Sequence, residues 1–580
     1  MKNHTACPLD CYDACEVKYQ EGQLKGVKDG HTQGFLCPHL NHYEDHERIT
    51  EATYKGETIS MDEAVEKLQE LIEATPKNEL LCYKGHGNFG LMQSVTEHFF
   101  ASHGNVLTEG SLCDGAGEAG IIEGRGSNKN MPYSEIEKSD VVIFWGRNPH
   151  VTSSHLLPLI KDKKIIVIDP VQTQIAKMAD YHVQLKPHTD LYFAMLLTRF
   201  LHIEGSCDEE FLEEYASEFE DYYELTQSIR IKATLDIMGL TLGDIGAVLE
   251  MLENQKVAIV CGVGIQKYRD GADVMRAIDA FAVALGLFGK EGCGVAYLGN
   301  SQEGIETPFN LKAKRVSCVD TPFDEFETVF IQGANPLAQM PDSTRVENAI
   351  YQTKNVVYFG LYENETSRRA DLVIPAKTFL EKNDIRTSYG HNAISPMPKQ
   401  YKSEIGISEY ELAKRLCEYF GVELKSEQEY IEHFKSFGVL RINGAFEVEE
   451  RENVPYKDGF DTDDDEFLFL DELEVLQESE EGKLHLLTPK SSKSLNSQFD
   501  RESCVYLHPN VGIKEGEDVK LSSDNGELVL KAKMSEALRD DTVLIYSGTP
   551  GVNNLTSSRH SYEGKCAVYQ ENMVSIIRDF

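Results

Sequence analysis

Four cysteines near the start of the chain have the spacing of a metal-cluster site. Cys7, Cys11 and Cys15 have three residues between neighbours in "CPLDCYDAC", and twenty-one residues separate Cys15 from Cys37 in "GFLCPH". A cubane iron–sulfur cluster takes four thiolates, so a tight loop can supply three of them while the fourth returns from elsewhere. The alternating stretch between Cys15 and Cys37, with Gly22, predicts a β-hairpin that brings Cys37 back.

Two other uses of these thiols remain open from spacing alone. A structural zinc site also takes four thiolates, and unliganded cysteines are common in protein cores. Zinc ligands usually come as two short pairs, so a grouping of three plus one fits zinc poorly. The spacing therefore favours a [4Fe-4S] cluster held by Cys7, Cys11, Cys15 and Cys37.

A fifth cysteine, Cys113, differs from the others. Most of the remaining cysteines lie in apolar runs, where a buried thiol is the default interpretation. Cys113 lies in "GSLCDGAGEAG", after a strand-like stretch and before a Gly- and Ala-rich segment that we expect to begin a helix. A thiolate at a helix N-terminus has a lowered pKa and is a soft ligand for a heavy metal. Its spacing alone still favours a core cysteine.

The elements that would position these residues repeat one plan of apolar strand, polar loop and helix. Strands are expected at 141–145 and 165–168, and within "KVAIVCGVGIQ", "TVFIQGANPLAQMPD" and "NVVYFGLYENETSRRADLVIPA". This plan predicts parallel sheets that hold ligands at the carboxyl ends of their strands. The segments "FWGRNP" and "IQGANP" resemble each other, which indicates two related Rossmann-like domains, with chance similarity as the alternative.

An earlier segment carries a glycine motif. Ser60–Ala74 is an amphipathic pattern with Ser60 as the expected N-cap, and the strand after it leads into Gly85, Gly87 and Gly90. This G-x-G-x-x-G is either a turn that needs positive φ angles or a phosphate cradle. No acidic residue follows about twenty positions later to bind a ribose, so a simple NAD site is not expected.

The last third of the chain changes character. Residues 451–482 are acidic, and we expect an exposed linker there. Short alternating strands follow, with a hairpin turn at Asp524, Asn525 and Gly526, and they predict a small β-barrel. The predicted domains are a cluster-binding domain (1–55), a discontinuous first α/β domain (56–130 and 310–425), a second α/β domain (131–309), an acidic connecting segment (426–482) and a C-terminal β-barrel (483–580).

Composition excludes several classes of function. A chain of 580 residues with 41% hydrophobic and 26% charged residues is globular and contains several domains. Its formal net charge of −39 repels phosphate backbones, so no nucleic-acid partner is expected. No apolar run approaches the roughly 18 residues of a spanning helix. Only six residues precede Cys7, too few for an export signal, so we expect a cytoplasmic protein without membrane insertion.

An ordered set of motifs resembles one known family. "CPLDCYDAC…GFLCPH", "GNFGLMQ…LCDGAGEAG", "WGRNPHVTSSH", "VIDPVQTQIAKMADYHVQLKPHTD", "GANPLAQMPD", "ETSRRADLVIPAKTFLEK" and "PGVNNLT" follow one another from end to end of the chain. Together they resemble the prokaryotic molybdopterin oxidoreductases, the dimethyl-sulfoxide-reductase and formate-dehydrogenase family. The specificity of the resemblance lies in the order of the set, because any one piece could arise by accident.

The resemblance implies a molybdenum or tungsten ion between two pterin guanine dinucleotides, beside one [4Fe-4S] cluster. Cys113 falls at the family's protein ligand to the metal, with Asp114 as the fallback ligand or, equally, a helix cap. The residues that the resemblance assigns to cofactor binding are Gly146, Asn148, Asp169, Thr173 and Asp190 for one dinucleotide, Gly333, Asn335 and Pro336 for the other, and Asn553, Asn554 and Thr556 near the pterins.

Two positions depart from the family pattern. Many relatives carry Lys two positions after the fourth cysteine, between cluster and pterin, where this chain has His39. Formate dehydrogenases place His directly after their metal-binding residue, where this chain has Asp114, and this mismatch argues against formate as the substrate.

The resemblance predicts an oxidoreductase that performs two-electron oxygen-atom or hydride transfer on a small-molecule substrate. Electrons would pass through the cluster to an external carrier or a partner redox subunit. The alternatives are a non-redox hydratase or transhydroxylase of the same cofactor class, and a non-catalytic electron-transfer or scaffold subunit of a larger redox complex.

Overall fold

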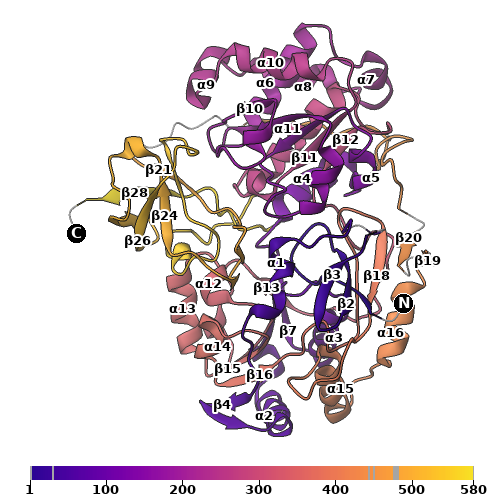
Figure 1. Ribbon diagram of the computed structural model, residues 1–580, viewed down its shortest axis with the longest axis vertical. Helices are drawn as coiled ribbons and strands as arrows, with labels where there is room; N and C mark the ends of the chain where they lie inside the picture. The colour runs from indigo at the N-terminus through magenta and orange to yellow at the C-terminus, as the bar shows by residue number, and fades with distance from the viewer. Residues whose placement is uncertain are drawn as a thin grey trace.

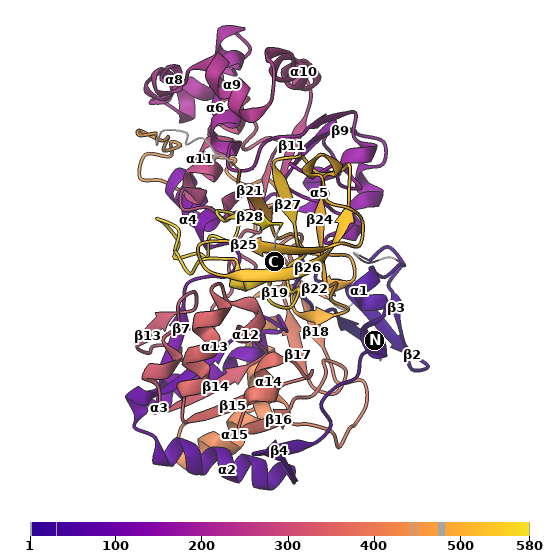
Figure 2. The same ribbon diagram turned by 90° about the vertical axis from the view of Figure 1, so that its left-hand side faces the viewer.

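The computed structural model describes residues 3–28, 30, 32–441, 445–448, 451–473 and 482–578. Two α/β bodies stand one above the other, and a C-terminal barrel lies against their junction (Figures 1 and 2). The predicted class, a multidomain α/β fold with parallel sheets and a final β-barrel, is confirmed.

The N-terminal segment forms a small antiparallel sheet. Its strands are β1 (His4–Ala6), β2 (Glu16–Gln20) and β3 (Gln23–Gly26). Strands β2 and β3 pair as the predicted hairpin, and Gly22 in their turn has a φ of 77°, which glycine adopts without steric cost. The short helix α1 (Pro38–Asn41) follows directly after Cys37.

The lower body contains an eight-stranded sheet in the order β13-β7-β6-β14-β15-β16-β4-β5. The strands are β4 (Ala52–Tyr54), β5 (Glu57–Ile59), β6 (Leu80–Lys84), β7 (Val106–Glu109), β13 (Arg315–Ser317), β14 (Thr328–Gln332), β15 (Asn355–Gly360) and β16 (Leu372–Pro375). The first six strands in this order, from β13 through β7, β6, β14 and β15 to β16, run parallel. At the other edge, β4 and β5 are antiparallel.

Helices cover both faces of this sheet. One face packs on α2 (Met61–Ala74), α3 (Val95–His103) and α15 (Glu409–Phe420), and the other on α13 (Ser343–Gln352). Two short helices, α12 (Pro336–Gln339) and α14 (Glu365–Arg369), follow β14 and β15. The helix predicted at 60–74 is confirmed, because Ser60 and Glu63 form a reciprocal capping box at its start.

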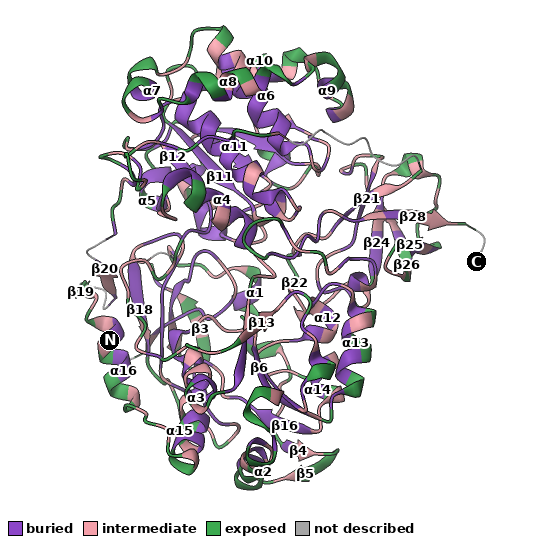
Figure 3. Ribbon diagram, turned by 180° about the vertical axis from the view of Figure 1, so that it is seen from behind, coloured by how far each residue is buried: buried purple, intermediate pink, exposed green. Residues whose placement is uncertain are grey.

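The upper body contains a five-stranded, fully parallel sheet in the order β10-β9-β8-β11-β12. Its strands are β8 (Val141–Trp145), β9 (Lys164–Ile168), β10 (Tyr181–Val183), β11 (Val257–Cys261) and β12 (Gly294–Ala296). The helices around it are α4 (Gly115–Arg125), α5 (Tyr133–Ile136), α6 (Asp190–Ile203), α7 (Glu209–Tyr215), α8 (Phe219–Gln227), α9 (Ile231–Met238), α10 (Leu242–Leu252) and α11 (Gly271–Ala284). Figure 3 shows the buried centre of this body at β11, β12 and α11.

The segment after β8 is not the α-helix that the repeated plan predicts. It forms a 3-10 helix at Ser154–Ile160 with Pro158 inside it. Proline lacks the N–H that an α-helix interior needs, which explains the tighter and shorter turn. Helix α4 precedes the domain boundary predicted at residue 130, yet it packs on α11 in the core of the upper body. The boundary itself stays a prediction.

Removal of a buried ion pair between α4 and α11 will destabilise the protein. Arg125 Nε donates to Asp279 Oδ2 at 2.7 Å, and the two side chains are 2% and 0% exposed. An unpaired buried charge costs about 3–5 kcal/mol, so we expect Asp279→Ala to lower the free energy of unfolding by about that amount in urea titrations. Glu418→Ala removes the exposed partner of Lys414 and should cost less than about 1 kcal/mol. Equal losses in the two variants would contradict the assignment.

The predicted acidic connecting segment, 426–482, is partly wrong. Its first part contains α16 (Glu427–Lys435), β19 (Gly438–Leu440) and β20 (Phe446–Val448), which join β17 (Asp384–Arg386) and β18 (Ala393–Met397) in an antiparallel sheet. The segment 451–473 is not an exposed linker either. Its aromatic side chains Tyr456, Phe460, Phe467 and Phe469 are buried in the core of the upper body, while acidic residues between them face solvent. Residues 474–481 lie outside the described part.

The C-terminal β-barrel is confirmed as a closed six-stranded barrel in the order β21-β27-β24-β26-β25-β28. Its strands are β21 (Leu484–Leu487), β24 (Cys504–Leu507), β25 (Asp518–Ser522), β26 (Glu527–Met534), β27 (Thr542–Leu544) and β28 (Met573–Ile577), and β22 (Ser494–Leu495) and β23 (Gln498–Phe499) form a small hairpin beside it. The predicted turn joins β25 to β26. Across the described residues, no helix has the length and apolar character that crossing a membrane requires.

Candidate functional site

The structure brings the four N-terminal cysteines together as free thiols. Cys7 N donates to Cys15 O at 2.8 Å, and Cys37 is the N-cap of α1. Burial raises the pKa of Cys7 to about 12, and the Cys37 thiol adds to this rise. The pKa of Cys15 is raised by burial and then by Asp13 and the other three thiols. Four thiols that disfavour one another's ionisation form a site that a cation would stabilise.

Arg386 on β17 shows that this region also suits an anionic group. The guanidinium is 2% exposed and donates to the carbonyls of Phe89 at 3.1 Å and of Leu9 and Cys11 at 3.3 Å. Its Nε has no hydrogen-bond partner, and no carboxylate in the described part of the chain forms an ion pair with it. A buried cation without a counter-anion is costly. A cluster ligated by four thiolates fits this donor set, because it would bring negative charge to the cation.

A buried carboxylate–imidazole pair contacts Cys15. His155 Nδ1 lies 2.8 Å from Asp13 Oδ2 and 3.2 Å from Cys15 Sγ, and both side chains are almost fully buried. The ligand atoms of Asp13, Cys15 and His155 all lie within 4.8 Å of one another, close enough to hold one metal ion. Asp13 also accepts from the Tyr133 hydroxyl, and His155 Nε2 contacts Phe35 O. The pair is therefore satisfied within the protein and orients Cys15.

Cys113 lies in the loop between β7 and α4, as the sequence predicts. Its carbonyl accepts from Gln266 Nε2 at 2.8 Å, and its N–H donates to Ser111 Oγ at 2.9 Å. Gln266 follows β11 of the upper sheet and also accepts from Gly117 N in α4. From the C-terminal domain, Cys566 Sγ contacts the Cys113 carbonyl at 3.7 Å. The Cys113 loop is thus held by residues of both bodies and of the C-terminal domain.

Asp114 occupies the N-cap position of α4, but its carboxylate does not cap the helix. Asp114 Oδ1 instead accepts from Ser111 Oγ at 3.1 Å. Burial raises the pKa of the Asp114 carboxyl, against the hydrogen bond from Ser111. Asp114 therefore can hold a proton beside Cys113.

Charged side chains from three distant segments surround Cys113. Lys490 Nζ forms an ion pair with Asp10 Oδ2 at 2.6 Å, and both side chains are partly exposed. Among the causes that raise the pKa of Lys490 are the charges of Asp10, Cys113 and Cys11. His86 is exposed by surface area, yet burial is the largest cause that lowers its pKa to about 4. The charges of Asp10 and Arg386 also act on this ring.

Five predicted cofactor residues gather at one edge of the upper sheet. Gly146 follows β8, Asp169 and Thr173 follow β9, and Asp190 begins α6. Asp190 Oδ1 accepts from Trp145 Nε1 at 2.7 Å, so one of its oxygens is already used. Asn148 donates to Gln174 Oε1 at 2.7 Å. Asp169 Oδ1 accepts from Val171 N at 2.8 Å, which leaves Oδ2 available to a ligand.

Removal of the Asp169 charge will stabilise the cofactor-free protein above neutral pH. Burial raises the pKa of Asp169 to about 7, and the charge of Asp190 adds to the rise. An unfolded aspartate ionises near 3.9, so wild-type stability falls as the pH rises from about 4 to about 7. We expect Asp169→Asn to match wild type near pH 4 and to exceed it by a few kcal/mol near pH 8 in thermal unfolding scans. A gain of equal size at both pH values would contradict this cause.

The matching residues of the lower sheet follow β14. Gly333 has a φ of 55° and open space around it. Asn335 Nδ2 donates to Glu365 Oε2 at 2.9 Å and its Oδ1 accepts from Thr366 Oγ1 at 2.8 Å, and Pro336 begins α12. The Asn335 side chain is therefore largely committed to α14. The backbone of Gly333 is also engaged, since its N–H donates to Phe359 O at 3.0 Å and its carbonyl accepts from Gly87 N at 3.1 Å. Only the space beside its Cα is open.

The glycine motif after β6 supports the same loop. None of Gly85, Gly87 and Gly90 has a positive φ, so the prediction of a turn that needs such angles is wrong. A Cβ on Gly85 would lie 2.6 Å from Ala334 Cβ, and one on Gly87 would lie 2.7 Å from Gly333 O. The missing side chains allow two loops at the carboxyl ends of β6 and β14 to touch.

The "VNNLT" residues join the barrel domain to the lower body. Asn553 Nδ2 donates to Ala338 O at 2.8 Å, and Thr556 Oγ1 lies 3.0 Å from Asn553 Oδ1. Asn554 Oδ1 accepts from Ser343 Oγ at 2.7 Å. These side chains hold the C-terminal domain in place beside α12 and α13.

His39 does not reach Cys113 or the four cysteines through any hydrogen bond of the described residues. Its Nε2 lies 3.3 Å from Ser491 O, and its ring stacks on Phe499. His39 therefore packs α1 against the segment between β21 and β22, next to Lys490.

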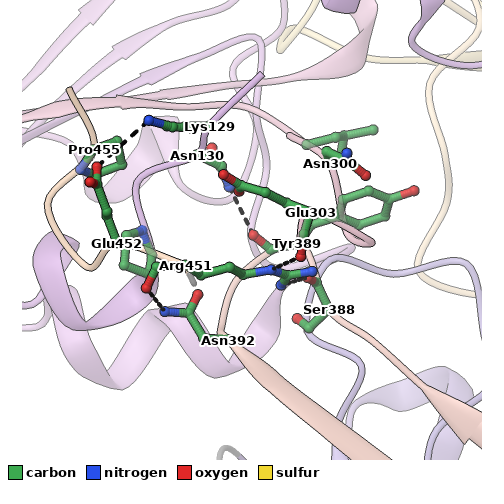
Figure 4. A pocket seen from close by; sticks show the side chains of 12 residues that line it. Lys129, Asn130, Asn300, Glu303, Ser388, Tyr389, Asn392, Arg451, Glu452 and Pro455 are labelled. Carbon is green, nitrogen blue, oxygen red and sulfur yellow. Dashed lines mark hydrogen bonds and ion pairs between the residues drawn. The ribbon is translucent and has the colours of Figure 1, made fainter. Parts of the chain in front are cut away.

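A small recess is lined by side chains from several distant segments (Figure 4). Its lining includes Lys129, Asn130, Glu303, Tyr389 and Arg451. Asn130 Nδ2 donates to Tyr389 O at 2.8 Å. Burial raises the pKa of Tyr389, and the charges of Asp114 and Cys113 follow as causes, so this side chain connects the recess to the Cys113 loop.

Sequence reasoning missed several residues of this region, namely Asp10, His155, Gln266, Arg386 and Lys490. Asp10 and His155 lie inside quoted motifs, and Gln266 ends a strand–loop unit that the sequence does single out. Arg386 and Lys490 carry no local signal, because only the tertiary fold places them beside the cysteines.

Two protein-family models match the chain. The one described as "Molybdopterin oxidoreductase" matches residues 61–402, which is more than half of the chain. The chain belongs to this family. A second, described as "Molydopterin dinucleotide binding domain", matches residues 478–571, which contain five of the six barrel strands and end before β28. The protein is therefore a molybdopterin-dependent oxidoreductase by family.

Individual relatives of this family member align from end to end. A probable oxidoreductase, YyaE of Bacillus subtilis, is 26% identical over 97% of both chains. The alpha subunit of F420-dependent formate dehydrogenase 1 from Methanococcus maripaludis is 22% identical over 93% of this chain and 94% of its own. Among solved structures, acetylene hydratase from Pelobacter acetylenicus has the same fold, with a TM-score of 0.81, 16% identity and full coverage of both chains.

Proposed function

We propose that the protein binds molybdenum or tungsten as a bis(molybdopterin guanine dinucleotide) and catalyses a two-electron oxygen-atom or hydride transfer on a small-molecule substrate. The observation that carries this proposal is the Cys113 loop, which is held by Gln266 of the upper body and contacted by Cys566 of the C-terminal domain. When bound, the metal–pterin group supplies the redox chemistry.

The residues around Cys113 have distinct parts in this proposal. The Cys113 thiolate would be the protein ligand, because sulfur suits a soft metal and its loop is fixed on both sides. Asp114 would hold a proton beside the metal, and Tyr389 would separate the Cys113 loop from the recess through which a substrate enters.

The dinucleotides would lie along the carboxyl ends of the two parallel sheets. One would contact Gly146, Asn148, Asp169, Thr173 and Asp190, where Asp169 keeps a free oxygen for the N–H groups of guanine. The other would contact the loop of Gly333, Asn335 and Pro336, where the missing side chain of Gly333 leaves space for it. Asn553, Asn554 and Thr556 would form the pterin side of the barrel domain.

Electrons would pass through one [4Fe-4S] cluster held by Cys7, Cys11, Cys15 and Cys37. The mutual electrostatic effects of these thiols and the unpaired Arg386 support an anionic cluster there. An external carrier or a partner redox subunit would then exchange electrons with the cluster. The alpha subunit of a formate dehydrogenase among the relatives is consistent with a subunit role.

A second candidate function is non-redox hydration by the same cofactor. It is favoured by the fold neighbour whose name is acetylene hydratase. Both functions require the same metal–pterin group, so only turnover separates them.

The test is anaerobic purification followed by analysis of molybdenum, tungsten, iron, sulfide and oxidised pterin. A dye-linked survey of formate, aldehydes, sulfur oxyanions, N-oxides and nitrate should then find turnover with one of them. Protein without metal and pterin would refute the proposal. Protein with both, which hydrates acetylene and never exchanges electrons with a dye, would support the second candidate.

A further inference from the structure

The positive charge between the four cysteines and Cys113 does not come from His39, the position that the family's lysine would occupy. His39 contacts Ser491 O and lies against Phe499. Two other cations lie in this region, Lys490 from the segment between β21 and β22 and Arg386 from β17.

These two cations differ in how their charge is balanced. Lys490 Nζ is 2.6 Å from Asp10 Oδ2, and Asp10 also accepts from Asn496 Nδ2 at 3.1 Å. The charge of Lys490 is thus offset by a carboxylate within hydrogen-bond distance. Arg386 has three backbone carbonyls as partners, an Nε without any partner and no ion pair among the described residues.

The three carbonyls give Arg386 a defined place. Leu9 and Cys11 belong to the loop of the first three cysteines, and Phe89 ends the glycine motif after β6. The guanidinium also lies over the Phe89 ring, at 4.7 Å from its centroid. The charges of Tyr389, Cys7, Cys11 and Asp10 act on Arg386, although none of these groups forms an ion pair with it, and the charge of Arg386 acts on Cys7.

We propose that Arg386, a buried positive charge without an ion-pair partner among the described residues, lies beside the cluster and sets its reduction potential, while its hydrogen bonds hold the cysteine loop. Arg386 is a positioning residue that does not touch the substrate. This inference rests on the proposed function, because it requires the cluster. An arginine stays protonated at any working pH, so the charge is permanent. A positive charge favours the reduced, more negative cluster, and its removal therefore lowers the potential.

The test compares Arg386→Met and Arg386→Lys by redox titration of the cluster, followed by electron paramagnetic resonance on anaerobically purified holoenzyme. We expect Arg386→Met to reduce the equilibrium constant for cluster reduction at least tenfold, which is 59 mV for one electron. Arg386→Lys keeps the charge and should restore most of this shift. A wild-type potential in Arg386→Met with full iron content, or an equal shift in both variants, would overturn the proposal.

The Asp10–Lys490 pair is the matched control because its charges cancel. Lys490→Met leaves Asp10 unopposed and should lower the potential, whereas Asp10→Asn should raise it. The double variant should differ little from wild type. Shifts of the same sign in the two single variants would contradict the charge argument.

Folding failure is also an informative outcome. If Arg386→Met contains no iron, Arg386→Lys must regain iron for the charge to matter. If neither contains iron while wild type does, Arg386 is an anchor of the loop only and the proposal is overturned. Wild-type protein without iron and sulfide would instead refute the proposed function.

Discussion

The Cys113→Ala variant will lose at least about 100-fold of its turnover with the substrate found in the dye-linked survey. The thiolate is the only protein ligand proposed for the metal, and changes even in groups that support a ligand usually cost 10–100-fold. Metal content should fall as well, measured by elemental analysis of the purified protein. Cys113→Ser keeps an oxygen ligand and should lose less of both.

Cys207→Ala is the control for loss of a half-buried thiol. Cys207 lies far along the chain, just before α7, and has the same intermediate exposure as Cys113. Its replacement should leave turnover and metal content unchanged. Full activity and full metal content in Cys113→Ala would remove the ligand role from Cys113 and direct attention to Asp114.

The Cys11→Ala variant will lose its iron. A [4Fe-4S] cluster needs one thiolate for each iron, and Cys11 lies between two other proposed ligands, Cys7 and Cys15. We expect iron and sulfide to fall from about four of each per chain to less than about a tenth of that amount. The protein should also unfold at a lower temperature, because the proposed cluster would tie α1 to the N-terminal hairpin.

Cys293→Ala is the comparison for the cluster, since this thiol is half-buried and lies outside the N-terminal site. Unchanged iron in Cys11→Ala would remove the cluster assignment. A chain that instead holds one zinc ion through the same four cysteines would support the alternative that their spacing leaves open.

The Cys113→Ala and Cys11→Ala variants also distinguish the proposed metal–pterin site from the proposed cluster. Cys113→Ala should retain iron and sulfide, because the four N-terminal cysteines are unchanged. Cys11→Ala should lose dye reduction even where molybdenum or tungsten remains, since electrons would have no cluster through which to leave. Loss of both centres in both variants would indicate general misfolding, which circular dichroism would show.

Local patterns allowed much of the fold to be predicted. The strand at 141–145 agrees with β8, and the hairpin after Cys15 is present, because buried parallel strands are continuous apolar runs and hairpins need glycine at their turns. The prediction of an exposed linker at residues 451–482 is wrong over 451–473 for a physical reason. The net charge of this segment suggests solvation, but aromatic residues placed between the acids bury themselves in the upper body.

In the candidate site too, local sequence patterns predict some residues and not others. Cys113 could be singled out because its neighbours begin a helix, yet nothing near it in the sequence indicates Gln266, 153 positions away, as the residue that holds its carbonyl. The glycines after β6 looked like a turn, whereas their reason is the close approach of the loop at Gly333. Residues that act through long-range packing leave no periodic or local signal.

By itself, the sequence determined the class of fold, the candidate cysteines and the family that the motifs resemble, because these depend on local spacing and on hydrophobic periodicity. Only the tertiary structure decided which charges face those cysteines. Arg386 and Lys490 lie hundreds of positions from Cys11, and their role depends on how sheet, loop and barrel meet in space. Electrostatic energy falls with distance in space, whatever the separation along the chain.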